Sequence, residues 1–476
     1  MGTTKVAIVG GGIAGLAAAW HLRQGKPDLD LVVLDGSDAP GGKLRRAELA
    51  GASIDVGAES MLARRPEGTD LAREVGLADR LTHPATMSAS IWSRGALHPM
   101  PVGTLMGVPS NPAAALGMLD AEEIAWAEGE RDRPLEATLE DLSVGEFVSA
   151  RVGSAVVDRL VEPLLGGVYA GHAHQLSLQA TMPQLWAAAT AGESVTAAAE
   201  RAFAMGSLNH TPVFAGVVGG LGALAEALVK SLLAQGVQIK SETVVRDVHR
   251  TSVEGRHAWA LTTGPVPAPI QYEADVLVIA VPAAPAAKLL APHIPYAASE
   301  LGAIAYSSMA IVSVALPRHG LPQLSGSGFL VPPVDGRAVK ASTFTTNKWS
   351  WVADLAPDLF ILRASLGRSG EEAVLQRSDS DLVRLVLADL ADALGGQLPT
   401  PVDSHVQRWG GALPQYAVGH VDRVSRICAA VAGVPGLEVA GAAYEGVGIP
   451  ACIASGQKAA AAVLTHLRGG PAMATD

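Results

Sequence analysis

The sequence predicts an α/β protein in which a parallel sheet is combined with a mixed-sheet domain and an inserted, mostly helical lobe. Three observations predict this class. The apolar residues 6–9 lead into a glycine-rich turn and then into residues with helical spacing. A second apolar strand, residues 31–34, follows that helix and ends at Asp35. Near the C-terminus, residues 437–440 form another apolar strand that leads into a glycine-rich segment opening a helix.

The first turn has the G-x-G-x-x-G spacing of a dinucleotide site. Gly10 permits a tight turn, Gly12 lets the backbone approach a pyrophosphate, and Gly15 lets the helix pack closely on the strand. The free N–H groups and the positive end of the helix dipole then face the phosphates. Asp35 follows Gly15 by 20 residues, where a carboxylate takes both hydroxyls of a ribose. Strand, turn, helix, strand and acid together predict a Rossmann-like domain.

Bulk properties restrict the function class. A chain of 476 residues exceeds one compact core, so about two or three domains are expected. The net charge is −11 and no block of basic residues occurs, which argues against a nucleic-acid partner. Cys428 and Cys452 are the only cysteines, so we expect no disulfide framework and a reducing compartment.

Targeting signals and dense clusters of reactive residues are not evident in the sequence. The chain opens directly into a strand, and no segment offers about 18 uninterrupted apolar residues, so we expect no transmembrane segment and a cytoplasmic location. Peripheral contact with a membrane stays open. The 13 histidines are scattered and no Ser/His/Asp arrangement is evident. We therefore predict no metal site and assign no catalytic side chain.

Two further glycine-containing segments extend the nucleotide signature. Residues 37–46 (S-D-A-P-G-G-K-L-R-R) bring backbone and positive charge close to a ligand. Residues 51–60 (G-A-S-I-D-V-G-A-E-S) read as a short strand followed by a turn suited to lie against a flat ring. Near the other end, residues 441–456 open a helix at about Val447, whose first N–H groups stabilise negative charge. These features indicate an FAD oxidoreductase.

The order of patterns divides the chain into five segments. The FAD-binding domain is expected in three pieces, the helical lobe is inserted after the first piece, and the substrate-binding domain precedes the last. Residues 143–146 predict a capping box that begins a helix running to Leu160, and residues 244–248 predict a strand. The expected segments are 1–79 (FAD-binding), 80–212 (helical lobe), 213–284 (FAD-binding), 285–404 (substrate-binding) and 405–476 (FAD-binding).

Six motifs together resemble the protoporphyrinogen and coproporphyrinogen oxidases. The resemblance covers nearly the whole chain and implies a bound FAD, three lobes, and six-electron oxidation of a porphyrinogen by O2 with release of hydrogen peroxide, as a step of heme biosynthesis. The motifs are G-G-K-L-R at 41–45, G-A-E-S at 57–60, G-A-L-H-P-M-P-V-G at 95–103, P-L-L-G-G-V-Y-A-G at 163–171, R-W-G-G-A-L-P-Q-Y-A-V-G-H at 408–420 and G-V-G-I-P-A-C-I-A-S-G at 446–456.

The resemblance also implies where the cofactor is held. The matching positions for FAD contacts are Gly10, Gly11, Gly12, Ile13, Ala14, Gly15, Asp35, Gly36, Gly42, Lys43, Arg45, Gly57, Ala58, Glu59, Ser60, Val245, Trp409, Val447, Gly448 and Ile449.

The substrate is the finer question. Membrane-bound protoporphyrinogen oxidases place an arginine where this chain has Ala89, and the segment after residue 99 is more similar to the bacterial enzymes that oxidise coproporphyrinogen III. The four carboxylates of coproporphyrinogen III need cationic partners in the protein. The candidates are Arg64, Arg65 and Lys348.

Other functions stay open beside this one. The alternatives are a protoporphyrinogen IX oxidase, a flavin amine oxidase, or a flavin-binding protein without catalysis. An amine oxidase builds an aromatic cage, and aromatic residues make up only 4% of this chain. The partners expected are the porphyrinogen and O2, with transient contact to later heme-pathway enzymes.

Overall fold

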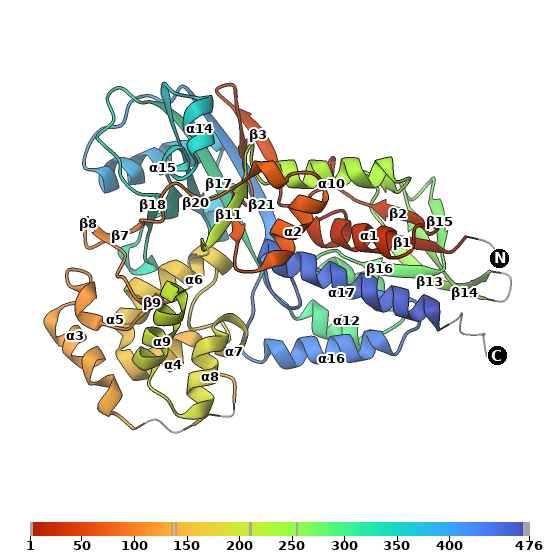
Figure 1. The fold of residues 1–476 in the computed structure, drawn as a ribbon, viewed down its shortest axis with the longest axis horizontal. Helices are drawn as coiled ribbons and strands as arrows, with labels where there is room; N and C mark the ends of the chain where they lie inside the picture. The colour runs from red at the N-terminus through yellow and green to blue at the C-terminus, as the bar shows by residue number, and fades with distance from the viewer. Residues whose placement is uncertain (1–2, 135–136, 139, 209–211, 254–255, 470–476) are drawn as a thin grey trace.

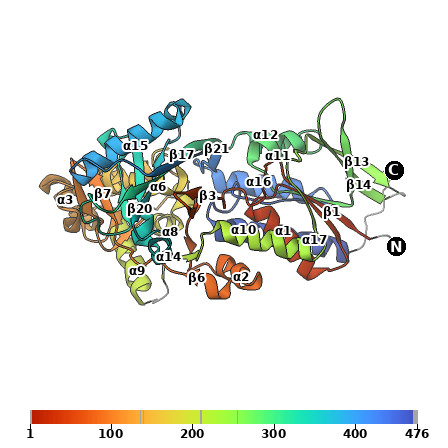
Figure 2. The same ribbon diagram turned by 90° about the horizontal axis from the view of Figure 1, so that it is seen from above.

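A five-stranded parallel sheet forms the centre of the first domain. The computed structural model describes residues 3–134, 137–138, 140–208, 212–253 and 256–469, and Figures 1 and 2 show their arrangement. The sheet has the order β12-β2-β1-β16-β22. Its strands are β1 (Lys5–Val9), β2 (Asp30–Leu34), β12 (Gln238–Lys240), β16 (Val276–Ile279) and β22 (Leu437–Val439).

Alternate residues of these strands are buried on opposite faces of the sheet. Val6 and Ile8 pack with the helices α1 (Ile13–Gly25), α10 (Gly222–Ala234) and α17 (Ile449–Arg468). Ala7 and Val9 pack with the opposite layer. That layer is formed by β13 (Asp247–Val253), β14 (Arg256–Thr263), β15 (Ile270–Ala274), α11 (Ala283–Leu290), α12 (Pro295–Gly302) and α16 (His420–Ala432). Burial on both faces explains why β1 and β16 read as continuous apolar runs.

The two glycine-started helices from opposite ends of the chain lie side by side. Figure 1 shows α1 and α17 in the same layer, close to β1. A Cβ placed on Gly456 would lie 2.2 Å from the carbonyl oxygen of Ala14, so glycine permits this close packing. The N-terminal and C-terminal glycine motifs therefore meet in space. The helix α17 begins at Ile449, two residues later than expected.

The second domain is a seven-stranded mixed sheet with the order β21-β17-β20-β19-β18-β7-β8. The helix α15 (Asp379–Leu394) packs on one face, with Leu382, Val386 and Leu390 in a core shared with β17 and β20. The strands are β7 (Ser90–Ser93), β8 (Ala96–Pro99), β17 (Tyr306–Pro317), β18 (Gly328–Leu330), β19 (Val339–Thr343), β20 (Leu359–Leu366) and β21 (Asp403–Pro414).

The membership of this sheet differs from the expected segments. Strands β7 and β8 come from the segment expected to be helical, and β21 comes almost wholly from the segment assigned to the FAD-binding domain. The helices α11 and α12, expected with the substrate-binding domain, pack on the parallel sheet instead. The sheet to which β7, β8 or β21 belongs is decided by pairing with strands that are distant in the sequence. The local composition of a strand does not indicate which strand it pairs with.

Most of the remaining lobe is helical, as expected. Its helices share one core and are α3 (Ala121–Glu128), α4 (Val144–Val152), α5 (Ser154–Val156), α6 (Glu162–Tyr169), α7 (Leu178–Thr181), α8 (Pro183–Ala191) and α9 (Val195–Leu208). The side chain of Ser143 accepts a hydrogen bond from the Glu146 N–H, which begins α4. The helix expected to run to Leu160 instead ends at Gly153, which has φ +93°, and a π-helical turn follows at Val157–Val161.

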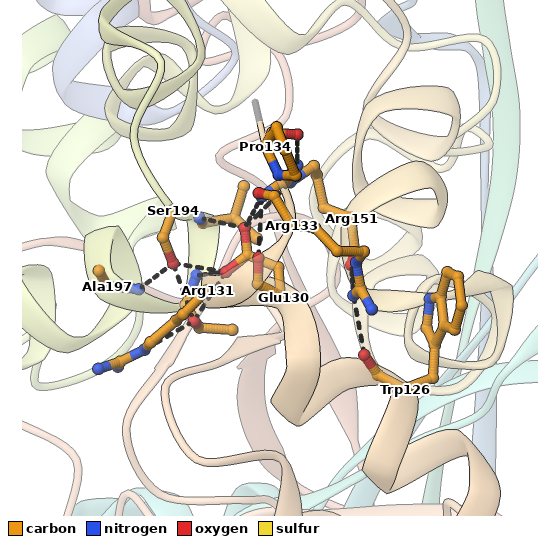
Figure 3. A network of polar contacts seen from close by, with 10 residues as sticks. Trp126, Glu130, Arg131, Arg133, Pro134, Arg151, Ser194 and Ala197 are labelled. Carbon is orange, nitrogen blue, oxygen red and sulfur yellow. Dashed lines mark hydrogen bonds and ion pairs between the residues drawn. The ribbon is translucent and has the colours of Figure 1, made fainter. Parts of the chain in front are cut away.

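A buried ion pair joins the helices of this lobe (Figure 3). Arg151 donates from Nε and Nη2 to Oε1 of Glu130, at 3.0 and 2.7 Å. Glu130 also accepts from the Val195 N–H and the Thr196 hydroxyl at the start of α9. Burial alone raises the pKa of Glu130, but hydrogen bonds led by those from Ser194 and Arg151 hold it below its usual range. The pair therefore fixes α4 against the start of α9.

Short elements complete the fold. The hairpin β3 (Arg46–Leu49) and β4 (Ala52–Asp55) precedes β5 (Met61–Leu62), which pairs with β11 (Phe214–Val217); β11 also pairs with β6 (Leu81–Thr82). The expected strand at 244–248 begins at Asp247. The rest are α2 (Pro66–Glu74), β9 (Thr104–Leu105), β10 (Val108–Pro109), α13 (Thr345–Lys348), α14 (Ser350–Leu355) and short 3₁₀ turns. Among helices in the described ranges, none combines the length and apolar character needed to cross a membrane.

Candidate functional site

The first glycine turn lies against residues 41–45, forming one wall of the site. The Gly41 N–H donates to the Gly11 carbonyl at 2.7 Å, and Gly10 has φ +110° where β1 turns toward α1. A Cβ on Gly15 would lie 1.9 Å from the Gly10 carbonyl oxygen, whereas a Cβ on Gly12 would meet no atom within 4 Å. Gly15 is therefore required for packing, and Gly12 faces open space, where the pyrophosphate was predicted to approach the backbone.

Asp35 closes the end of β2 against the glycine turn. Its Oδ2 accepts from the Gly11 N–H, and its Oδ1 accepts from the Ser37 N–H at 2.7 Å. The side chain is buried. Beside it, the Thr243 N–H donates to the Asp35 carbonyl at 2.7 Å, which brings the buried Val245 to this edge of the sheet. Asp35 and Val245, both expected to contact FAD, therefore lie at the same edge of the sheet.

Lys43 is a cation without a protein anion beside it. Burial lowers the pKa of its ammonium group, and the structure shows for Nζ no hydrogen bond and no ion pair with any residue that it describes. Lys43 interacts electrostatically with Cys452 in the first turn of α17, where burial raises the pKa of the thiol to about 11. A half-buried cation beside the first turn of α17 would suit the pyrophosphate of FAD, whose negative charge would pair with it.

A second wall is formed by residues 57–60 and Trp409. The Ala58 N–H donates to the Lys43 carbonyl at 3.1 Å, and a Cβ on Gly57 would lie 1.9 Å from the same oxygen. Trp409 on β21 donates from Nε1 to the Val56 carbonyl at 3.0 Å. Residues distant in sequence thus meet around Gly57, as the flavin hypothesis requires.

Glu59 in this turn holds two cations that come from the second domain. Lys348 Nζ lies 2.6 Å from Oε1, and Arg363 Nη1 lies 2.9 Å from Oε2. The structure thus places Lys348, one of the expected substrate cations, in an ion pair. Arg363 was not predicted as a site residue, although a single charged residue inside the apolar strand at 359–366 is a signal for it.

Gln415 and Tyr416 connect three of the motifs and were also missed. Gln415 donates from Nε2 to the Tyr169 carbonyl at 2.8 Å, which fixes the end of α6. The Tyr416 hydroxyl donates to the Ala442 carbonyl and accepts from the Gly446 N–H at 2.8 Å. These contacts fix the loop that leads into α17. The N–H groups of residues 447–449, at the junction of this loop and the helix, were expected to face the flavin.

The remaining expected cations lie at or near the surface. Arg45 pairs with Asp38 in its own loop, and Arg65 pairs with Glu67. Arg64 is exposed and lies near Gly206 of α9, without an acidic partner among the residues that the structure describes. No group of three or more His, Cys, Asp or Glu in the described ranges could hold a metal ion.

His420 predicts a specific pH dependence. It is buried and stacks on Tyr416 at 3.9 Å, and burial lowers its pKa from 6.5 to about 4. Between pH 6.5 and 4 the unfolded chain binds a proton that the folded protein does not, so stability falls as the pH falls. We expect His420→Asn to remove this part of the loss, up to about 3 kcal/mol. Urea unfolding at pH 7.5 and 4.5 checks it, and an unchanged difference between the two pH values would contradict it.

Known proteins match this chain over nearly its whole length. Residues 13–464 match the family model for flavin containing amine oxidoreductases. The coproporphyrinogen III oxidase of Mycobacterium tuberculosis (strain ATCC 25618 / H37Rv) is 35% identical over 97% of both chains. That of Bacillus subtilis (strain 168) is 33% identical, covering 98% of this chain and 99% of its own.

Solved structures show the same architecture. A candidate protoporphyrinogen oxidase from Exiguobacterium sp. 255-15 has a TM-score of 0.85 and 32% identity, covering 98% of this chain and 99% of its own. Cyclohexylamine oxidase from Brevibacterium oxydans IH-35A has a TM-score of 0.68 at 17% identity, covering 98% and 100%, and so shares the fold.

Proposed function

We propose a function from one premise: the chain belongs to the flavin containing amine oxidoreductase family and, within it, to the coproporphyrinogen and protoporphyrinogen oxidases. The proposed reaction is the oxidation of coproporphyrinogen III to coproporphyrin III in heme biosynthesis. The observation that carries the proposal is the full-length identity to coproporphyrinogen III oxidases. The enzyme is an FAD-dependent oxidoreductase. We further propose that O2 accepts the electrons, that the enzyme works in the cytoplasm, and that later enzymes of the pathway contact it transiently.

FAD, when bound, supplies a two-electron acceptor. Formation of the porphyrin removes six electrons and six protons in three two-electron steps, and each step reduces one O2 to H2O2. The protein orients the substrate and excludes water. The N-terminus of α17 stabilises negative charge nearby by roughly 0.3–2 kcal/mol.

The proposal is tested with the purified holoenzyme and coproporphyrinogen III in air. We expect porphyrin fluorescence to appear together with three H2O2 per porphyrin formed. Absence of both would reject the function. Faster turnover of protoporphyrinogen IX would favour the alternative that the 29% identical protoporphyrinogen oxidase of Macaca fascicularis supports.

Arg64 is the foremost candidate for a substrate carboxylate. Arg65 and Lys348 remain candidates, but each already has an acidic partner. We expect Arg64→Ala to raise KM for coproporphyrinogen III about tenfold or more with little change in kcat, because a charge-assisted hydrogen bond contributes about 1.5–3 kcal/mol. The matched control is Arg73→Ala on α2, where the arginine is exposed and paired with Asp70. Equal KM values in both variants would remove Arg64 from the proposal.

A further inference from the structure

The ion cluster of Glu59, Lys348 and Arg363 is buried between two domains. The exposed fractions of the three side chains are 11, 15 and 9%. Each oxygen of the Glu59 carboxylate faces one cation, at 2.6 Å for Lys348 and 2.9 Å for Arg363. Lys348 ends α13 and Arg363 lies in β20, so two separate elements of the second domain hold one residue of the first.

The two cations also hold both ends of the turn that carries Glu59. Arg363 donates from Nη2 to the Gly57 carbonyl at 2.5 Å. Lys348 donates to the Ser60 hydroxyl at 3.4 Å. The other side of the turn rests on the Lys43 carbonyl through Ala58. The turn at 57–60 is therefore fixed from the substrate-binding domain as well as from its own.

The charges of the cluster do not cancel. Burial alone raises the pKa of Glu59, but Lys348 and Arg363 together hold it below its usual range, so its carboxylate is ionised. One carboxylate faces two cations, so these three side chains together carry one positive charge. Asp55 interacts electrostatically with Glu59 and Arg363, and its carboxylate accepts from the Leu221 and Gly222 N–H groups at the start of α10. When it is ionised at pH 8, it offsets the positive charge of the cluster. Burial raises the pKa of Asp55 to about 6.

We propose that Glu59, Lys348 and Arg363 are positioning residues that hold the 57–60 turn against FAD, and that the two cations raise the reduction potential of the flavin while the Glu59 carboxylate lowers it. This inference rests on the placement of the flavin beside Gly57 in the proposed function. A fixed positive charge in a dry site stabilises the extra negative charge of the reduced cofactor. The second domain thus sets a property of a cofactor bound by the first.

Charge changes of opposite sign test the inference. We expect Glu59→Gln to raise the midpoint potential and Lys348→Met to lower it, each by about a tenfold change in the ratio of oxidised to reduced flavin, which is about 30 mV for two electrons. Lys348→Arg keeps the charge and should keep the wild-type potential. The potentials are measured at pH 8 by equilibrating each FAD-loaded variant with a dye of known potential during slow reduction.

The matched control is Glu130→Gln, which breaks a buried ion pair in the helical lobe. It should lower the thermal midpoint without changing the potential. Shifts of the same sign in Glu59→Gln and Lys348→Met, or shifts no larger than that of the control, would overturn the inference. If Glu59→Gln does not hold FAD, the comparison of Lys348→Met with Lys348→Arg decides. A wild-type protein that binds no FAD would instead reject the proposed function.

Discussion

Gly15→Ala is expected to lower the stability of the FAD-free protein. Gly12→Ala is expected to leave the stability of the FAD-free protein unchanged but to lose FAD. A Cβ at position 15 meets the Gly10 carbonyl oxygen at 1.9 Å, so the backbone of β1 or α1 must move. Such overpacking costs about 1–3 kcal/mol, and more where backbone is involved. At position 12 the Cβ meets no atom within 4 Å and φ is −69°, which alanine adopts without strain.

The loss of FAD in Gly12→Ala follows from the empty space beside the Gly12 Cα, which the protein itself does not fill. The methyl group occupies the space in which we place the pyrophosphate, so we expect the Kd for FAD to rise about 100-fold, or about 2.7 kcal/mol. Thermal unfolding of the deflavinated variants and titration with FAD measure the two effects separately. Unchanged FAD affinity in Gly12→Ala would show that the phosphates bind elsewhere. Unchanged stability in Gly15→Ala would contradict the packing argument.

Arg151→Met is expected to destabilise the helical lobe by about 3–5 kcal/mol. The substitution leaves the Glu130 carboxylate, whose side chain is 0% exposed, without its cation. The hydroxyl and N–H donors at the start of α9 remain, but none of them carries a charge. Urea unfolding followed by tryptophan fluorescence measures the effect, since Trp126 lies in this lobe (Figure 3).

An exposed ion pair in the same lobe provides the control for Arg151. Arg201 on α9 pairs with Glu193, and their side chains are 57 and 45% exposed. Exposed pairs contribute about 1 kcal/mol or less, so Arg201→Ala should change stability little. Similar losses in Arg151→Met and Arg201→Ala would mean that the buried pair adds nothing beyond ordinary surface charge.

Local patterns in the sequence predicted the parts of the site whose physics is local. The glycines at 10, 12 and 15 follow from the geometry of one turn, and the strand at 31–34 follows from burial on both faces. Pairings across long sequence separations could not be predicted in the same way. Lys348 lies 289 residues from Glu59, and nothing in the neighbours of either residue indicates that they pair. The same reason explains why β7 and β8 were expected outside the seven-stranded sheet.

The packing of α17 against α1 has a consequence during synthesis of the chain. The wall of the site formed by residues 10–15 is translated early, whereas the helix α17 that completes it spans Ile449–Arg468 and is translated much later. A nascent chain that has not yet reached α17 therefore cannot enclose FAD between these helices, and cofactor capture must follow translation of that helix. Ribosomes stalled before residue 449 should carry no tightly held FAD.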